Sequence, residues 1–332
     1  MPTDGNVIRF GILGAARIAP LALIRPATHV AEARVVAVAA RDGARATAFA
    51  RAHGIPRAHD SYEALLADPE VDAVYNPLPN ALHGRWTRAA LRAGKHVLCE
   101  KPFTANADEA TEVARAATDS GLVVMEAFHY RYHPVAIRMR EIVDSGELGT
   151  LERVETALCF PLPRFSDIRY NWALAGGATM DAGCYAVHMA RLLGREEPEV
   201  VSATPKRRDA NIDRAMTAEL RFPSGHTGQV RCSMWSWSLL RMSARVVGSK
   251  GELRVFNPIL PQLTHKLTII AGGKRRVERL SKRPSYEYQL EAFCAAVLRG
   301  ASIATPPSDA IANMRVIDAI YRKAGMQPRQ PS

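Results

Sequence analysis

From Val7 to Glu126, short and almost continuously apolar runs alternate with longer amphipathic segments. Runs of this kind are typical of strands buried on both faces, and the segments between them have helical periodicity. The expected strands are Val7–Leu13, Arg34–Ala40, Val71–Asn76, His96–Glu100 and Val123–Glu126, and the expected helices are Ala16–His29, Gly43–His53, Ser61–Ala67, Asn80–Ala93 and Asn106–Ser120. The alternation predicts an α/β domain of the Rossmann type, with a doubly wound parallel sheet.

The pattern changes after a helix expected at Pro134–Ser145. Strands then follow one another through short turns typical of hairpins. They are expected at Leu151–Phe160 and near 198–206, 214–222, 226–237, 240–247, 251–256, 266–271 and 275–280, with helices at Ala178–Leu193, 285–299 and 308–324. We therefore expect an α+β domain on a mostly antiparallel sheet, with residues 1–127 and 128–332 as the two domains.

Composition narrows the class of protein. The chain has 332 residues, of which 47% are hydrophobic and 23% charged, which indicates a folded globular protein of two domains. Its 44 Lys and Arg against 33 Asp and Glu give a net charge of +11. The basic residues are scattered, so we expect no nucleic-acid partner; a biased genome composition or an anionic small ligand explains the excess as well.

The sequence gives no indication of a membrane span, a disulfide framework or a metal site. No apolar run reaches the length of a membrane span and the first residues are polar, so we expect a cytoplasmic protein without a membrane partner. The five cysteines are widely spaced and form no C-x-x-C pair, so neither a disulfide framework nor a metal site is expected.

A glycine turn follows the first expected strand. The segment from Gly11 through Gly14 and Ala16 to Arg17 and Ile18 is an imperfect G-x-G-x-x-G pattern, in which Leu13 replaces the middle glycine. At a strand–helix junction, backbone N–H groups and the helix dipole favour a pyrophosphate. We therefore expect these residues to bind a dinucleotide, although a glycine turn after any strand is the simpler alternative.

The end of the second strand indicates which dinucleotide. NAD enzymes usually place an acidic residue there for the ribose hydroxyl, but this strand ends in Arg41 and Asp42. A guanidinium at this position suits a 2′-phosphate. The sequence therefore favours NADP, and Asp42 keeps NAD as the alternative.

Four longer motifs follow in the sequence: VYNPLPNALH at 74–83, AGKHVLCEKP at 93–102, EAFHYR at 126–131 and GGATMDAGCY at 176–185. Together they resemble the glucose–fructose oxidoreductase/inositol dehydrogenase (Gfo/Idh/MocA) family. The resemblance covers nearly the whole chain, and its nearest branches are dihydrodiol and D-xylose dehydrogenases and sugar ketoreductases. It implies an open-faced sheet in the second domain and hydride transfer between a nicotinamide and a carbinol or carbonyl carbon of a sugar, sugar derivative or cyclic diol.

The family pattern also assigns the nicotinamide side of the cofactor site. It places there a group of residues at the ends of two neighbouring strands, with Asn80 equally able to cap the next helix. These residues are Asn76, Pro77, Leu78, Asn80, His83, Glu100 and Lys101.

Four residues are the catalytic candidates. Lys101 follows a strand's carboxyl end, where it could donate to the substrate oxygen and favour ionisation of a nearby hydroxyl. Asp181, Tyr185 and His188 share one face of the helix expected at Ala178–Leu193. The family resemblance makes Tyr185 the proton donor or acceptor, with Asp181 orienting the substrate or the lysine; for His188 a buried structural role is the alternative. Gly177 and Gly183 are expected to let a ligand approach this helix.

Substrate contacts and assembly complete the sequence-based predictions. Arg131 and Arg169 are candidates for binding sugar hydroxyls or a phosphate, with exposed surface arginine as the alternative. Trp235 and Trp237 alternate with polar residues on the strand expected at 226–237. A covered sheet face there predicts a homodimer or homotetramer through the second domain, and an intrachain core is the alternative.

Two other functions fit the same motifs. Some proteins of this family bind NAD(P) without catalysis and regulate transcription, and others are NAD-dependent glycosidases. The presence of Lys101, Asp181 and Tyr185 argues against a regulator, because a sensor needs no acid/base set. A glycosidase would show no net turnover of the nicotinamide.

Overall fold

The computed structural model describes residues 6–332, which form two compact units. The first contains the chain up to Thr104, Asp108–Tyr132 and Pro284–Ala310, and the second contains Ala105–Ala107, His133–Arg283 and Ile311–Ser332. Nothing in the sequence pattern indicated that Pro284–Ala310 returns to the first unit.

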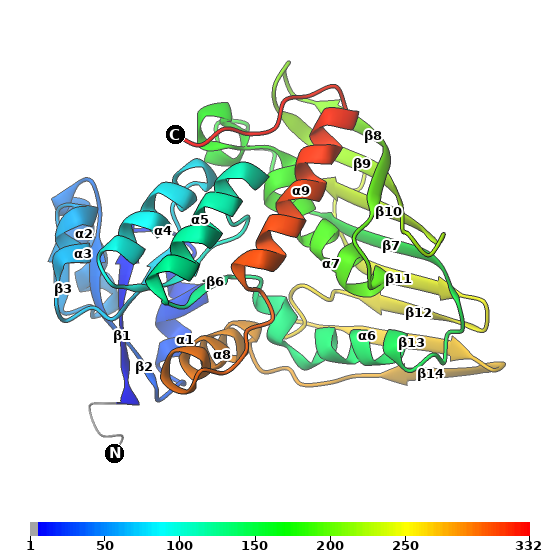
Figure 1. Ribbon diagram of the computed structural model, residues 1–332, viewed down its shortest axis with the longest axis horizontal. Coiled ribbons are helices and arrows are strands. Elements are labelled where there is room, and N and C mark those ends of the chain that lie inside the picture. The colour runs from blue at the N-terminus through cyan, green and yellow to red at the C-terminus, as the bar shows by residue number, and fades with distance from the viewer. Residues whose placement is uncertain (1–5) are drawn as a thin grey trace. The chain divides into compact units, whose positions relative to one another are not determined.

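The first unit contains a six-stranded parallel sheet, which confirms the predicted Rossmann-like fold (Figure 1). The strand order is β3-β2-β1-β4-β5-β6, so successive crossovers leave β1 in opposite directions. The short, half-exposed strand β3 is the one that the apolar pattern missed. The strands are β1 (Ile8–Leu13), β2 (Ala33–Ala39), β3 (Arg57–His59), β4 (Ala73–Asn76), β5 (His96–Cys99) and β6 (Val124–Glu126).

Helices cover this sheet and enclose its core. The helix expected at Ala16–His29 is shorter and begins as a π-helical turn, Pro20–Ile24, before α1 (Arg25–Ala27). The last segment of the unit, α8 (Ser285–Arg299), contributes Leu290 and Phe293 to the main core cluster. The ring of Phe293 lies 5.5 Å from that of Phe10 in β1. The other helices are α2 (Gly43–His53), α3 (Tyr62–Ala67), α4 (His83–Arg92) and α5 (Ala107–Ser120).

The second unit contains an eight-stranded sheet in the order β14-β13-β12-β11-β7-β10-β9-β8. All neighbouring strands are antiparallel except β7 and β10, which are parallel, so the predicted α+β domain is confirmed. The strands are β7 (Leu151–Cys159), β8 (Glu199–Arg207), β9 (Asp213–Arg221), β10 (Thr227–Ser233), β11 (Arg241–Gly248), β12 (Gly251–Phe256), β13 (Lys266–Ala271) and β14 (Lys274–Glu278), and the helices are α6 (Pro134–Asp144), α7 (Cys184–Gly194) and α9 (Pro307–Lys323).

The two faces of the eight-stranded sheet differ in chemistry. Val154 and Val246 are buried against the apolar residues of α6, as strand alternation requires for one face. The alternate positions carry ion pairs, such as Arg153 with Glu155 and Arg245 with Glu252. The second face is therefore charged and partly exposed.

The tryptophan pair does not lie on a strand, which corrects the sequence-based prediction. Strand β10 ends at Ser233, and the side chain of Trp237 is 96% exposed. The Ser233 hydroxyl donates to Ser236 Oγ over 2.7 Å, and the Ser238 N–H donates to the same atom over 3.2 Å. The N–H groups of Met234 and Trp235 both donate to the Arg214 carbonyl, so the regular ladder ends here, and the serine side chains then bond locally.

Two further expectations concern whole-chain properties. No helix within residues 6–332 has the length and apolar character needed to cross a membrane. All five cysteines are buried and none forms a disulfide, as their spacing predicted.

Candidate active site

The glycine turn lies at the carboxyl end of β1. Gly14 has a φ of +93°, and a Cβ there would stand 3.0 Å from Leu78 Cδ2, so both backbone and space require glycine. Half-buried Ala16 and Ile18 and exposed Arg17 follow, at a helix start whose first N–H groups have no carbonyl partner in the helix. The turn therefore presents donors and a positive charge to an anion.

Gly11 has a different role from the one that its motif suggests. It lies inside β1, and a Cβ there would come within 2.7 Å of Leu65 Cδ2 on α3. Its missing side chain makes room for a helix of the protein itself. Only Gly14 of the two glycines lies where the strand ends.

The strand order indicates that a ligand would bind beside this turn. Because crossovers leave β1 and β4 in opposite directions, ligands of doubly wound folds bind at the carboxyl ends of these two strands. Leu78, two residues beyond β4, is the residue that reaches Gly14. Half-buried Pro77 and Asn80 lie on the same connection, so the structure brings the glycine turn and the segment after β4 together.

Two arginines lie at the end of β2, next to the turn. Arg41 is exposed, as is Arg45 in the first turn of α2, and Arg45 donates to the Ala15 carbonyl over 2.9 Å. Burial raises the pKa of Tyr62, and both arginines oppose this effect, so the three side chains lie close together. Asp42 is the N-cap of α2, since its Oδ1 accepts from the N–H groups of Ala44 and Arg45.

Sequence reasoning missed Arg45, although a signal existed. The first turn of α2 contains no acidic residue, and Arg45 places a cation at the positive end of the helix dipole. That arrangement is unfavourable in an isolated helix and becomes favourable when an anion binds. Together with Arg41 it forms a pair of guanidinium groups suited to a phosphate.

Two predicted cofactor residues are buried and bonded to the protein itself. His83 Nδ1 lies 2.8 Å from the Pro102 carbonyl and its Nε2 lies 2.7 Å from the Leu78 carbonyl. Burial lowers the pKa of His83 to about 4, and the charge of Lys101 adds to this effect. Asn76 Nδ2 donates to the His83 carbonyl and to Thr87, while its buried Oδ1 has no partner among the described residues. Both side chains hold the connections after β4 and β5 in place.

The segment after β5 carries the candidate lysine. Glu100 is nine-tenths buried and accepts from the Tyr75 hydroxyl over 2.7 Å and from the Lys101 N–H over 3.2 Å. The Lys101–Pro102 peptide is cis, and the Lys101 side chain is half-exposed. Arg131, also half-exposed, follows β6 in the same unit. A buried carboxylate beside an accessible ammonium suits orientation of polar ligand groups.

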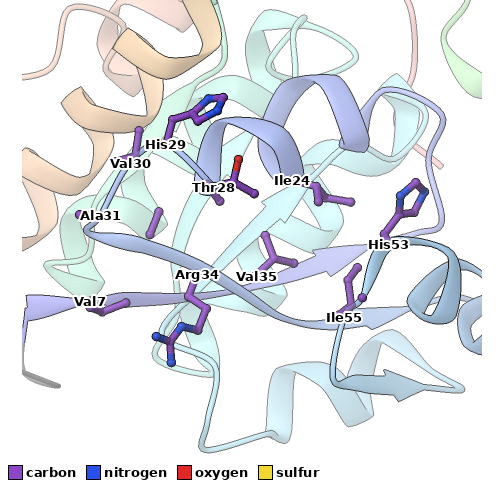
Figure 2. Close-up of a pocket in the computed structure, with 13 residues that line it drawn as sticks. Val7, Ile24, Thr28, His29, Val30, Ala31, Arg34, Val35, His53 and Ile55 are labelled. Atoms are coloured by element: carbon purple, nitrogen blue, oxygen red, sulfur yellow. The ribbon is translucent and has the colours of Figure 1, made fainter. Parts of the chain in front are cut away.

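One cavity of the first unit lies away from the glycine turn. Its volume is about 430 Å³, and Val7, Ala33 and Arg34 place it at the amino ends of β1 and β2, opposite the glycine turn. In Figure 2 the side chains of Arg34, His29 and His53 point in different directions. No group of charges converges there, so we assign it no part in the chemistry.

The second unit carries the other catalytic candidates on a helix of mixed type. The expected helix Ala178–Leu193 begins as a π-helical turn, Thr179–Gly183, and continues as α7. Asp181 lies in the π turn, and Arg169 Nε lies 3.2 Å from its carboxylate. Tyr185 is 7% exposed and His188 is 3% exposed. Lys101 belongs to the first unit, whereas these residues belong to the second.

The two glycines of this helix face protein groups, which corrects the expectation that they admit a ligand. A Cβ on Gly183 would stand 3.0 Å from Cys232 Sγ on β10. Gly177 has a φ of +132°, and a Cβ there would lie 2.3 Å from Asp213 Oδ1. Both positions are therefore glycine because the helix start packs closely against its own unit.

Family models match both units. The model described as "Oxidoreductase family, NAD-binding Rossmann fold" matches residues 8–128, and that of the GFO/IDH/MocA C-terminal domain matches residues 136–254. The chain belongs to the Gfo/Idh/MocA oxidoreductase family. The resemblance deduced from the motifs is thereby confirmed, and so is the expectation of an oxidoreductase.

Relatives within the Gfo/Idh/MocA family match two thirds or more of the chain. D-xylose 1-dehydrogenase (NADP(+)) 2 of Haloferax volcanii is 42% identical over 95% of this chain and 97% of its own. Trans-1,2-dihydrobenzene-1,2-diol dehydrogenase of Macaca fuscata fuscata is 38% identical over 68% of this chain and 67% of its own. KijD10, a 3-ketoreductase from Actinomadura kijaniata solved with NADP and TDP-benzene, superposes with a TM-score of 0.89 at 30% identity, covering 97% of this chain and 98% of that chain.

The residues of the first unit fit the dinucleotide that the Gfo/Idh/MocA family binds. The donor set at the ends of β1 and β2 consists of backbone N–H groups and the guanidinium groups of Arg41 and Arg45. Asp42, the one carboxylate of the strand end, is engaged in capping α2. Within residues 6–332 no group of three or more His, Cys, Asp or Glu side chains could hold a metal ion.

Proposed function

We propose that this protein is an NADP-dependent oxidoreductase acting on a sugar, a sugar derivative or a cyclic diol. The observation that carries the cofactor choice is the pair Arg41 and Arg45 beside the Gly14 turn, with Asp42 used as a helix cap. The names of the relatives support the substrate class: a D-xylose dehydrogenase, a dihydrodiol dehydrogenase and a sugar-nucleotide reductase. The first unit binds the dinucleotide, and the second binds the substrate and mediates assembly.

In this proposal one side chain transfers the proton, and others stabilise the reacting oxygen or orient the substrate. Bound NADP supplies the hydride acceptor or donor for the carbinol carbon. Lys101 donates a hydrogen bond to the reacting oxygen and stabilises negative charge on it. Tyr185 takes the hydroxyl proton as a tyrosinate during oxidation and returns it as a neutral phenol during reduction. Asp181, held by Arg169, orients the substrate, as does Arg131, while His188 is the reserve candidate for the proton transfer.

Variants of a relative support the assignment of Lys101 and Tyr185. KijD10 has been solved with a lysine replaced by alanine or glutamate and, separately, with a tyrosine replaced by phenylalanine, each with TDP-benzene and NADP. The substituted lysine and tyrosine have the same separation along that chain as Lys101 and Tyr185 have in this one.

Variant kinetics test the catalytic assignment. Tyr185→Phe should lower turnover by about 10²–10⁴-fold while leaving thermal unfolding and the NADP dissociation constant unchanged. Lys101→Ala should lower turnover at least as far. The double variant should be little worse than either, since groups acting on one oxygen are not additive. Lys282→Ala, which removes an exposed lysine near α8, is the matched control. A Tyr185→Phe enzyme within threefold of wild type would refute the assignment of Tyr185.

A substrate panel separates the three candidate functions. Sugars, sugar phosphates and dihydrodiols are incubated with NADP or NAD, and absorbance of the reduced nicotinamide is followed. A dehydrogenase gives stoichiometric reduction of NADP. A regulator binds the dinucleotide without turnover, and a glycosidase releases sugar without net reduction. Either of these last two results would overturn the proposal.

A further inference from the structure

A buried ion pair lies where the catalytic helix of the second unit begins. Arg329, in the segment after α9, and Asp213, at the start of β9, are both 0% exposed. Arg329 Nη2 donates to Asp213 Oδ1 over 2.8 Å. Burying two charges is costly, and such pairs often stabilise a fold no more than apolar residues would. Stability alone is therefore a weak reason for this pair.

Both oxygens of Asp213 are engaged, and they face different elements. Oδ1 accepts from Arg329 and, over 3.0 Å, from the Tyr321 hydroxyl of α9. Oδ2 accepts from the N–H and the hydroxyl of Thr179, each over 2.7 Å. Thr179 is the first residue of the π turn, so the carboxylate acts as the cap that this helix start otherwise lacks.

Arg329 also contacts the loop that precedes this helix start, at Trp172 and Gly176. Its Nε donates to the Gly176 carbonyl over 2.6 Å, and its guanidinium lies 4.7 Å from the ring centroid of Trp172 and 4.0 Å from that of Tyr321. The Gly177 N–H donates in turn to the Arg169 carbonyl over 2.7 Å. Arg329 thus contacts the loop that carries Arg169, which pairs with Asp181.

Glycine at position 177 is a consequence of this network. A Cβ there would lie within 3 Å of Asp213 Oδ1, Arg329 Nη2 and the Tyr321 hydroxyl. The side chains of the network therefore fill the space that a Cβ on Gly177 would need. A rigid contact at this point limits how the π turn, and the side chains on it, can shift.

We propose that Asp213 and Arg329 are positioning residues for hydride transfer, which hold Thr179 and thereby set the places of Asp181 and Tyr185. This inference rests on the proposed function of Tyr185. A helix start displaced by a fraction of an ångström moves the proton-transferring hydroxyl, and misplacement of about 1 Å can cost 10²-fold in rate. Cofactor binding, which belongs to the first unit, is not involved.

Two variants that each remove one buried bond to Asp213 test the proposal. Thr179→Val removes the hydroxyl bond at the π turn and keeps its N–H bond, and Tyr321→Phe removes a bond on the opposite oxygen and keeps the ring beneath Arg329. Thr179→Val should lower kcat by about ten- to hundredfold, and Tyr321→Phe by less than threefold. Both should leave the NADP dissociation constant within twofold. Arg329→Lys should retain more turnover than Arg329→Ala.

Turnover of the double variant Thr179→Val/Tyr185→Phe distinguishes positioning of Tyr185 from a purely structural role of Thr179. If Thr179 acts through Tyr185, Thr179→Val should lower turnover little further in the Tyr185→Phe background. Equal effects of Thr179→Val and Tyr321→Phe on kcat would refute positioning and leave the function of Tyr185 intact. Wild-type turnover of Tyr185→Phe would overturn both the function of Tyr185 and the inference that rests on it.

Discussion

Replacing Arg41 with alanine tests how the protein selects its dinucleotide. NADP differs from NAD by a 2′-phosphate, which carries about two negative charges near neutral pH. Arg41 is exposed at the carboxyl end of β2, and Arg45 lies beside it with one N–H already given to Ala15. Arg41 lies closer to the end of β2 than Arg45, so its loss should affect NADP alone.

The structure sets the size of the effect. A hydrogen bond to a charged group contributes about 1.5–3 kcal/mol. Because the Arg41 guanidinium is exposed to water and salt, we take the lower half of that range. At about 1.4 kcal/mol per tenfold, Arg41→Ala should weaken NADP binding by about ten- to fiftyfold and NAD binding by less than threefold. Arg45→Ala should have a smaller effect in the same direction.

Dissociation constants for both dinucleotides, measured by tryptophan fluorescence at two salt concentrations, provide the assay. The salt dependence of NADP binding should decrease in Arg41→Ala, because fewer charges meet in the complex. Arg51→Ala is the matched control, since it removes an exposed arginine from the last turn of the same helix α2. It should leave both constants within twofold.

Three results would refute this reasoning about Arg41. Wild-type protein could prefer NAD by tenfold or more. Arg41→Ala could weaken both dinucleotides equally, which would assign Arg41 to the part they share. Arg51→Ala could match Arg41→Ala, in which case overall charge rather than position would be responsible.

Three other predictions concern stability and assembly. Burial lowers the pKa of His83 and of His133 to about 4, so the unfolded chain binds protons first as pH falls below about 6.5. Urea unfolding should therefore show a loss of stability between pH 6.5 and 4, by up to about 3 kcal/mol for each histidine, and a smaller loss in His83→Gln. Gly194→Ala should cost about 1–3 kcal/mol, since its Cβ would collide with the Phe222 ring, and urea midpoints will measure this loss. Light scattering at micromolar concentration should give a mass at least twice that of the 36.3-kDa chain, and a monomeric mass would refute assembly through the second unit.

The sequence was sufficient for the elements whose pattern is local. Strands such as β1 and β5 are buried on both faces and therefore read as continuous apolar runs, and α2 was predicted with its observed bounds because Asp42 and Gly54 cap it. The strand β3 was missed because its three residues are half-exposed and mostly polar. A strand of that kind is held by its neighbour β2 rather than by its own composition.

Other features depend on contacts between distant segments. The π turn at Thr179 requires Asp213, which lies in no recognisable motif, and Arg329, which follows the last helix. The end of β10 is decided by hydroxyl bonds among Ser233, Ser236 and Ser238, in a run whose alternation is typical of a strand. Tertiary and side-chain bonds override propensity in both cases.

The candidate site was predictable to the extent that family motifs name residues. Lys101, Arg41 and Gly14 lie at strand ends, as the motifs implied, but Gly11, Asn76 and His83 serve the protein's own packing and hydrogen bonding. A motif records which residues recur together and does not separate those that touch a ligand from those that support them. That distinction needs the partners of each side chain.

The return of α8 to the first unit has a consequence for synthesis on the ribosome. Phe293 and Leu290 complete the core around Phe10, yet they are translated after the whole of His133–Arg283. At about 5–20 residues per second, that intervening segment takes roughly ten to thirty seconds to make. During this time the amino-terminal sheet has emerged without the apolar residues that α8 adds to its core. The nascent chain should therefore depend on chaperones, and a fragment that ends before α8 should aggregate rather than fold.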